Sequence, residues 1–396
     1  MKMLSIDMNL TEHRQQLTAL KNKGYFNYGG QGPLPESALE AIFNSYRHIQ
    51  NIGPFSHVIG DWVAEELQKT REAMATELQV PPSSITLTEN VSTGCNIALW
   101  GILWKAGDHL LLTDCEHPGI IAAAQEISRR FGVLLSTCPI LETLNEGNPV
   151  EAIASHIQPN TKLVIMSHLL WNTGQVLPQK EIVAAVRSQN PNTQILVDAA
   201  QSVGSLPLNL TDDGVDFYAF TGHKWWCGPE GLGGLYVRPE ALETLNPTYI
   251  GWRGILTTTT GQPKGWKPDG RRYEVATSAY PLLSGLRAAI AFHQSWGTVQ
   301  QRYDQICKLS AILWEKLGEI PQVHRLRATP PESGLISFQL ESGQHKQLVG
   351  ALESQNLMVR TILHPNCVRA CVHYFTEIGE IERLVEAIAC IQRFAL

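Results

Sequence analysis

Long apolar runs are absent from this sequence of 396 residues, and none approaches the length of a membrane-spanning helix. The first residues, MKMLSIDMNLTEHRQQ, have no apolar core of signal-peptide length. We therefore expect a protein without a membrane partner, located in the cytoplasm. Charge of one sign is also scarce, because 31 Lys and Arg face 37 Asp and Glu, a net charge of −6. This mild charge gives no reason to expect nucleic acid as a partner.

The eight cysteines are scattered, and no pair has the spacing of a metal or redox motif. Only Cys367 and Cys371 lie close together, and they do not form a CxxC pair. His364 and His373 flank them, but not at a recognised zinc spacing. We therefore predict no metal site and reduced, mostly buried thiols, as in a cytosolic protein.

The sequence does have the composition of a globular protein with a large core, with 43% hydrophobic and 17% charged residues. In its first two thirds, short apolar segments alternate with helical patterns, which predicts an α/β fold with a mostly parallel sheet covered by helices. The predicted strands are residues 85–88, 109–113, 133–138, 162–167, 194–198, 217–221 and 234–237. The predicted helices are residues 36–51, 62–78, 96–104, 120–131, 150–157 and 179–190.

The last third predicts a smaller α+β domain, which follows an irregular region at residues 239–281. Its predicted strands are 334–340, 357–361 and 369–375, and its predicted helices are 282–296, 298–317, 345–354 and 377–394. We divide the chain into three parts. These are an N-terminal segment, 1–24, with a helix at 11–23 that packs with the small domain, a large domain, 25–281, and a small C-terminal domain, 282–396.

One lysine stands out in the stretch TGHKWWCGP, residues 221–229. Lys224 is followed by two tryptophans, and desolvation by such neighbours lowers the pKa of an amine and makes it a nucleophile toward carbonyls. Upstream, a buried strand ends in Asp198, with Gln201 close behind. A lysine that can form an imine and an acid that can face a pyridinium nitrogen are the minimum equipment for pyridoxal phosphate (PLP). By itself, the stretch also fits a surface lysine in a turn.

Polar residues follow most of the predicted strands, where ligands bind in sheets of this kind. The turn at residues 89–96 precedes a helix, whose free N–H groups and dipole favour a phosphate, although Ser92 or Thr93 also fits an ordinary N-cap. A glycine-rich loop at residues 25–35 is either functional or a linker. The clustered polar residues are Ser92, His117, Asn172, Asp198, Gln201, Thr221, His223 and Lys224.

Over nearly its whole length, the chain resembles the fold-type I PLP enzymes of aminotransferase class V, the NifS-like group of cysteine desulfurases. The resemblance rests on seven motifs in the same order. They are the turn at 90–96, the EHP at 116–118, Asn172, the DAAQ at 198–201, the TGHK at 221–224, the YEVAT at 273–277 and the pair Arg360 and Arg369. It implies a large domain with a seven-stranded sheet and a smaller domain beside it.

The resemblance also implies a role for each matching residue. Lys224 carries PLP, Asp198 pairs with the ring nitrogen, Gln201 bonds the phenolic oxygen and His117 stacks on the ring. The phosphate is held by Val91, Ser92, Thr221 and His223, together with Thr277 of a neighbouring subunit, so that two subunits of a homodimer share their active sites. Asn172, Arg360 and Arg369 face the substrate.

Three of these roles have alternatives from the residues themselves. His117 before a proline fits a helix cap, Arg360 fits a structural ion pair, and Gln201 fits a bond to backbone alone.

The chain departs from the desulfurases between Arg360 and Arg369, where that family carries a nucleophilic cysteine on a mobile loop. Here the link is only residues 361–368, and Pro365 stiffens it. Cys367 lies on this short link, so we interpret it as structural. Without a sulfur acceptor, Lys224 can remove the Cα proton and drive β-elimination, as in the similar cystine C–S lyases.

The predicted function is therefore a C–S lyase acting on cystine or cysteine. Its products are pyruvate, ammonia and a persulfide or sulfide, which supply sulfur, for example to an iron–sulfur scaffold as acceptor. The alternatives are a cysteine desulfurase using Cys367 and a class V epimerase or aminotransferase.

Overall fold

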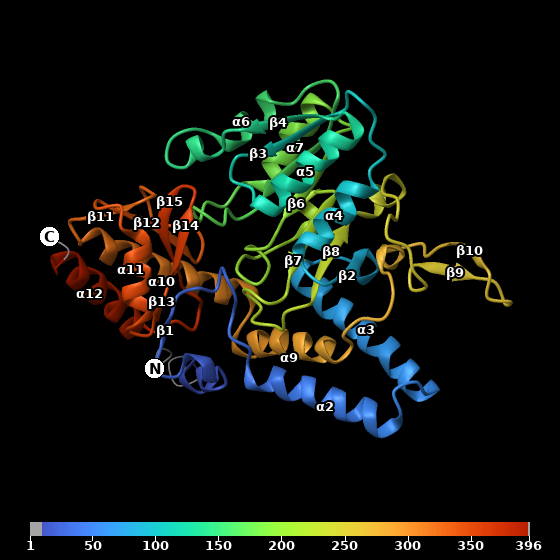
Figure 1. The fold of residues 1–396 in the computed structure, drawn as a ribbon, viewed down its shortest axis with the longest axis horizontal. Helices are drawn as coiled ribbons and strands as arrows, with labels where there is room; N and C mark the ends of the chain where they lie inside the picture. The colour runs from blue at the N-terminus through green and yellow to red at the C-terminus, as the bar shows by residue number, and fades with distance from the viewer. Residues whose placement is uncertain (1–9, 395–396) are drawn as a thin grey trace.

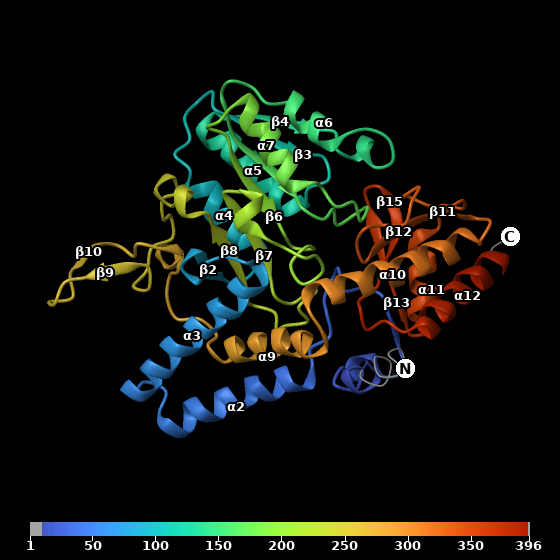
Figure 2. The ribbon, with the colours of Figure 1, turned by 180° about the vertical axis from the view of Figure 1, so that it is seen from behind.

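The computed structural model describes residues 10–394, which form a large α/β unit beside a smaller α+β unit (Figures 1 and 2). The large unit contains a seven-stranded sheet in the order β2-β8-β7-β6-β5-β3-β4, and only β8 runs against its neighbours. The predicted mostly parallel, seven-stranded sheet is thus confirmed. Its strands are β2 (Ile85–Thr88), β3 (His109–Thr113), β4 (Leu134–Cys138), β5 (Thr161–Ser167), β6 (Gln194–Asp198), β7 (Phe217–Thr221) and β8 (Gly233–Val237).

Helices cover both faces of this sheet because its central strands are apolar on both sides. Every residue of β3, β7 and β8 is buried, so neither face of these strands meets solvent. The helices of this unit are α2 (Glu36–Ile52), α3 (His57–Leu78), α4 (Val91–Gly101), α5 (Pro118–Phe131), α6 (Pro149–Ser155), α7 (Gln179–Gln189) and α8 (Leu210–Asp213).

The smaller unit is a four-stranded antiparallel sheet, in the order β11-β12-β15-β14, packed against helices. A short parallel pair, β1 with β13, joins the N-terminal part of the chain to this unit. Its elements are β1 (Gly24–Tyr25), α10 (Val299–Gly318), β11 (Val323–Arg325), β12 (Leu335–Leu340), α11 (His345–Glu353), β13 (Leu357–Met358), β14 (Arg360–Leu363), β15 (Asn366–Cys371) and α12 (Ile378–Phe394), and α9 (Pro281–Trp296) leads into them from the large unit.

Three local predictions were wrong. The helix expected at 11–23 ends at residue 15 and is followed by a short 3-10 turn, Thr18–Leu20. The last strand expected, 369–375, is β15 and stops at Cys371, because the following aromatic rings turn into the core. The region 239–281 is not wholly irregular, since β9 (Ile255–Thr257) and β10 (Pro263–Trp266) form a hairpin that projects from the body (Figure 1).

The units are connected at both ends of the chain. In the N-terminal segment, His13 contacts Tyr374 and Arg14 forms an ion pair with Glu380 at the start of α12. Helix α9 packs along α2 and also contacts α3, beneath the large sheet (Figure 1). The domain boundaries at 24/25 and 281/282 stay predictions. Among residues 10–394, no helix has the length and apolarity to cross a membrane.

Candidate active site

Lys224 lies on the loop that follows β7, and its amine is enclosed by protein atoms although part of the side chain remains accessible. Burial lowers the pKa of Lys224 to about 8; Asp198 opposes this effect, while Arg369 and Arg360 add to it. In the described part of the chain, the amine has no hydrogen-bond or ion-pair partner. A larger fraction of this amine is therefore neutral, and nucleophilic, than for an exposed lysine at the same pH.

Asp198 ends the neighbouring strand, β6, and is buried. Burial raises the pKa of its carboxyl, whereas a hydrogen bond from Ala200 N (2.9 Å) and the charges of Lys224 and His117 lower it. A buried carboxylate of this kind favours a cation, such as a protonated ring nitrogen, in front of it.

Gln201 lies one short turn beyond Asp198 and has two partners. Its Nε2 donates to Gly29 O (2.8 Å), and its Oε1 accepts from Trp225 Nε1 (2.9 Å). The alternative that Gln201 bonds backbone alone is therefore wrong, and its bond to the phenolic oxygen of PLP stays a prediction. One N–H of the amide remains free to bond a ligand oxygen.

The glycine-rich loop at residues 25–35 packs directly on these side chains. A Cβ at Gly29 would lie 2.9 Å from the guanidinium carbon of Arg369 and 3.1 Å from Gln201 Oε1. A Cβ at Gly32 would lie 2.1 Å from Lys224 O, and the backbone N–H of Gly32 donates to His223 O (2.8 Å). Glycine is required at both positions by this close approach, so the loop is part of the site and not a simple linker.

His117 caps α5, as one of the two alternatives predicted. Its Nδ1 accepts a hydrogen bond from Gly119 N (3.2 Å), and its ring meets Trp171 edge-on at 5.7 Å. Burial lowers the pKa of His117, and the charges of Asp198 and Lys224 also act on it. The cap uses one nitrogen only, so the ring face stays accessible to a planar ligand.

The first turn of α4 presents free backbone N–H groups, as any helix start does. Asn90 caps it by accepting from Thr93 N (2.9 Å), which leaves the Ser92 hydroxyl exposed. Ser92 and Thr277 line one cavity of about 920 Å³, and Lys224 is not among its lining residues. At the end of β7, Thr221 Oγ1 lies 2.7 Å from His223 Nδ1.

Arg369 and Asn172 are buried and each keeps one unpartnered polar atom, Nε and Oδ1 respectively. Arg369 donates to Trp171 O (2.7 Å), and Asn172 Nδ2 donates to His364 O (3.1 Å). Arg360 faces Arg369 across the β14–β15 ladder and is exposed. Among the described residues it has no ion-pair partner, so the alternative of a structural ion pair finds no support.

Cys367 lies within β15, on a hairpin that turns back after Leu363. It is buried, its Sγ lies 4.0 Å from Asn172 O, and burial raises its pKa to about 12. A thiol in this setting remains protonated and enclosed, whereas a nucleophilic cysteine needs a thiolate and access.

Glu116 is a residue of the site that sequence reasoning did not single out by itself. It is buried and accepts hydrogen bonds from Thr113 Oγ1 (2.6 Å), Ser167 N (2.8 Å) and Ser167 Oγ (2.9 Å). It therefore ties the end of β3 to the end of β5. Burial and the charge of Asp198 raise the pKa of Glu116 to about 7. Its place in the EHP motif was the available signal.

The structure thus brings the charges of Asp198, Arg360 and Arg369 close enough to Lys224 to affect its pKa, and those of Asp198, Lys224 and Arg360 close enough to affect the pKa of His117. This sheet, with a low-pKa lysine after β7 and a buried acid at the end of the neighbouring β6, defines an α/β enzyme centred on a lysine. The chain belongs to the aminotransferase class-V family, whose model matches residues 24–384.

Two solved structures resemble the chain closely. The complex of the cystine C–S lyase C-DES with its reaction product cysteine persulfide is 49% identical, with a TM-score of 0.93, and the match covers 94% of this chain and 99% of that one. A lysine-to-alanine mutant of C-DES, with glycine covalently linked to the PLP cofactor, gives the same identity and TM-score over 95% and 98% of the two chains.

Curated relatives are more distant. Isopenicillin N epimerase of Streptomyces clavuligerus is 32% identical over 378 residues, 91% of this chain and 93% of its own. A probable cysteine desulfurase of Xylella fastidiosa (strain 9a5c) is 26% identical over 387 residues, 93% of this chain and 91% of its own.

Proposed function

We propose that the protein is a PLP-dependent carbon–sulfur lyase that cleaves cystine by β-elimination into pyruvate, ammonia and cysteine persulfide. The observation that carries this proposal is the combination of a low-pKa lysine amine with a buried Cys367 on a tight hairpin. The likeness to C-DES over nearly the whole chain supports it.

The residues fit PLP by their chemistry. Among residues 10–394 the amine of Lys224 has no hydrogen-bond or ion-pair partner, and Asp198 is a buried carboxylate that suits a protonated ring nitrogen. Val91 and Ser92, at the start of α4, together with Thr221 and His223, would hold the phosphate. When bound, PLP supplies an electron sink for negative charge that develops at the substrate Cα.

The chain's own residues then divide the work. Arg369 and Asn172, each with an unpartnered buried atom, bind and orient the substrate carboxylate. Arg360 pairs with Arg369 across the β14–β15 ladder and so lies on the same face of the sheet, where its positive charge also attracts the substrate carboxylate. Lys224 accepts the Cα proton, the Cβ–S bond breaks, and its electron pair leaves with the persulfide sulfur. Water converts the remaining three-carbon fragment to pyruvate and ammonia.

Cystine is the preferred substrate because a persulfide is less basic than a thiolate and leaves more readily. The rival cysteine desulfurase needs Cys367 as a nucleophile, which its burial opposes. The likeness to an epimerase keeps epimerisation as a second candidate. Pyruvate formed without an added keto acid separates elimination from both epimerisation and transamination.

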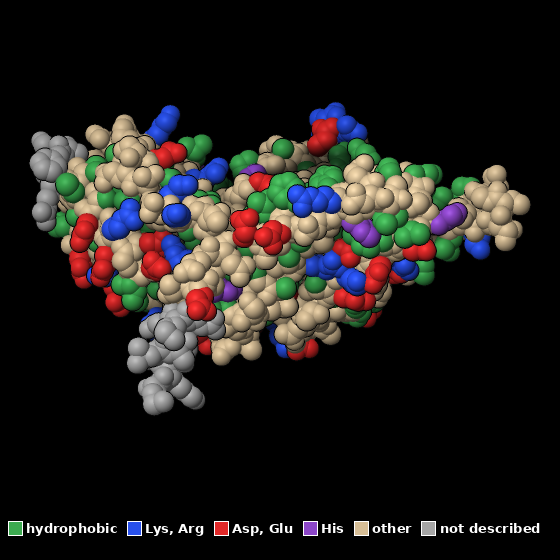
Figure 3. Space-filling view, turned by 90° about the horizontal axis from the view of Figure 1, so that it is seen from below, with side chains coloured by type: hydrophobic (Ala, Val, Ile, Leu, Met, Phe, Trp, Pro, Cys, Tyr) green, Lys and Arg blue, Asp and Glu red, His purple; other side chains and the backbone are tan. Residues whose placement is uncertain are grey.

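We also propose that the working form is a homodimer in which Thr277 of one subunit reaches the phosphate held by the other. Thr277 is exposed and lines a large cavity. Large apolar side chains are exposed on α2, Phe43 by 54% and Tyr46 by 49%, and on the face that carries this helix hydrophobic residues lie among charged ones (Figure 3). Location in the cytoplasm and transfer of sulfur to an iron–sulfur scaffold stay proposals.

The test is to mix the purified protein with PLP and cystine and to measure pyruvate with lactate dehydrogenase. Wild type should bind PLP with a yellow colour and release pyruvate. Lys224→Ala should lose at least 1,000-fold in rate, because it removes the base. A protein that stays colourless with PLP, or a K224A variant with full activity, would overturn the proposal.

A further inference from the structure

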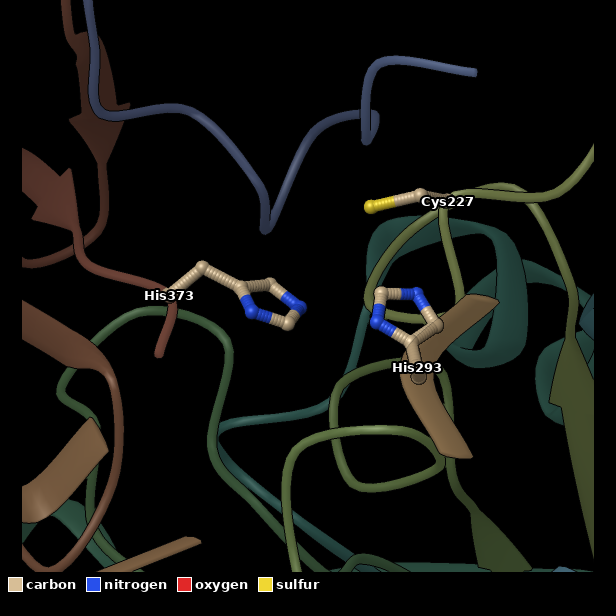
Figure 4. A group of neighbouring side chains, drawn as sticks. All are labelled: Cys227, His293 and His373. Carbon is tan, nitrogen blue, oxygen red and sulfur yellow. The ribbon is translucent and has the colours of Figure 1, made fainter. Parts of the chain in front are cut away.

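A buried cluster of side chains lies directly behind the lysine loop. It consists of His293 on α9, His373 after β15 and Cys227, three residues beyond Lys224 (Figure 4). Their nitrogen and sulfur atoms lie within 4.8 Å of one another. This arrangement raises the question of a metal site, and the hydrogen bonds of the two imidazoles answer it.

Both nitrogens of His373 are already engaged. Its Nε2 lies 3.0 Å from Trp225 O, and because a carbonyl can only accept, this nitrogen carries the proton. Its Nδ1 accepts from the backbone N–H of Tyr374 at 3.0 Å.

His293 is engaged in the same way. Its Nε2–H donates to Trp226 O at 2.9 Å, so its Nδ1 accepts from the Tyr374 hydroxyl, also at 2.9 Å. The Tyr374 oxygen in turn accepts from His13 Nε2 at 2.7 Å. One arrangement of protons therefore satisfies the whole chain of bonds.

This arrangement leaves no imidazole lone pair for a metal ion. Burial also raises the pKa of the Cys227 thiol, which opposes the thiolate that a metal would need. Burial lowers the pKa of His373 to about 3 and that of His13 to about 4, so both rings are neutral near pH 7. The cluster binds backbone carbonyls of the lysine loop.

Among residues 10–394, those two carbonyls accept no backbone N–H, while their neighbours do. Gly222 O accepts from Gly228 N (2.9 Å), His223 O from Gly32 N (2.8 Å) and Lys224 O from Cys227 N (3.0 Å). The next carbonyls, of Trp225 and Trp226, are buried and receive the imidazole N–H groups of His373 and His293, and Trp225 O has in addition only the weak donor Cys227 Sγ at 4.0 Å. A buried carbonyl without a donor is costly, so the histidines fix the path of the loop.

We propose that His373 and His293 are positioning residues that hold the Lys224 amine at a fixed position relative to the substrate-binding Arg369. Arg369 lies on β15, and His373 follows it by four residues, two beyond the end of the strand at Cys371, so β15 sets the position of both the arginine and the histidine that holds the lysine loop. The role assigned to Lys224 rests on the proposed function, whereas the hold on its loop does not.

The experiment compares His373→Leu, which removes the donor, with His373→Gln, whose amide N–H can replace it. The matched control is His345→Leu: His345 is also buried in the smaller unit, but it bonds Leu340 N (3.0 Å) and not the lysine loop. Tyr374→Phe is a milder variant that removes a single oxygen.

Two readouts are used on the full chain, amide hydrogen exchange of the peptide covering residues 221–229, and PLP affinity with the pH titration of the bound cofactor's absorbance. H373L should exchange about 10-fold faster in this peptide and bind PLP about 10-fold more weakly, with a shifted titration. H373Q should restore most of the wild-type exchange rate and PLP affinity. Y374F should exchange about 3-fold faster than wild type in this peptide, and H345L should change neither the exchange rate nor the PLP affinity.

The proposal is overturned if H373L matches H345L in both readouts, or, should H373L not fold, if Y374F matches wild type in peptide exchange. A stoichiometric metal in the purified wild type that is lost from H373Q would also overturn it, in favour of a metal site. Failure of wild type to bind PLP would refute the proposed function alone, because the exchange of the peptide still tests the hold on the loop.

Discussion

Replacing Glu116 by Gln should remove the contribution of this carboxyl to the pH dependence of the protein's stability. The folded chain raises the pKa of Glu116 from 4.5 to about 7, chiefly by burial. Between these pH values the folded protein therefore keeps a proton that the unfolded chain releases. Stability falls as pH rises through this window, because the unfolded state then binds fewer protons than the folded state.

The size of the effect follows from that window. From pH 4.5 to about 7, at about 1.4 kcal/mol for each pH unit, the free energy of unfolding of wild type falls by about 3 kcal/mol. A neutral glutamine at this position causes no such fall. Glutamine can still accept from Thr113 Oγ1 and Ser167 N, and its amide donates to the Ser167 hydroxyl as the protonated carboxyl does, but it exchanges an O–H for an NH2 group whose second N–H has no acceptor among these partners. That exchange costs E116Q about 1 kcal/mol at every pH.

The assay is urea unfolding of wild type and E116Q at pH values from 4.5 to 8. E116Q should be less stable than wild type by about 1 kcal/mol at pH 4.5 and more stable by about 2 kcal/mol at pH 8. The exposed variant Glu151→Gln, on α6, is the control and should stay within about 0.5 kcal/mol of wild type. A difference between E116Q and wild type that does not change with pH would refute the buried, protonated carboxyl.

Three further predictions concern the substrate side of the site. Arg369→Lys should raise KM for cystine about 10- to 100-fold in steady-state assays, because an ammonium cannot bind a carboxylate with two parallel bonds; an unchanged KM would remove Arg369 from substrate binding. Cys367→Ala should keep cystine cleavage within about 2-fold of wild type, since its buried thiol takes no part, and loss of sulfur release with PLP still bound would favour the desulfurase. Gly29→Ala should raise KM about 10-fold, because the added Cβ displaces Arg369. The control Gly60→Ala should leave KM unchanged, because a Cβ at Gly60 has no other atom within 4 Å. Equal KM values for the two variants would contradict the close packing of Gly29 on Arg369.

The seven-stranded sheet and its order of polar strand ends could be predicted because both depend on local patterns. Apolar runs of strand length repeat between helical segments, and the carboxyl ends of parallel strands meet at one edge. That logic placed Asp198 beside Lys224, and the structure gives each an effect on the pKa of the other.

The parts that sequence reasoning missed depend on contacts between distant segments. His13, His293 and His373 come together only after folding, and nothing in their local sequence connects them. The β9–β10 hairpin was missed because it is largely exposed and lacks an alternating apolar pattern. In the sequence, Glu116 is noticeable only as the residue before His117 in the EHP motif. Its burial follows from the pairing of β3 with β5, which the local sequence does not reveal.

The most direct test of the account is the balance of products from cystine with the PLP-loaded wild-type protein. Elimination predicts one pyruvate, one ammonia and one sulfane sulfur for each cystine consumed, with no alanine, and a slower reaction with cysteine. Alanine in place of pyruvate, with sulfur retained on Cys367, would contradict the proposed lyase and identify a desulfurase.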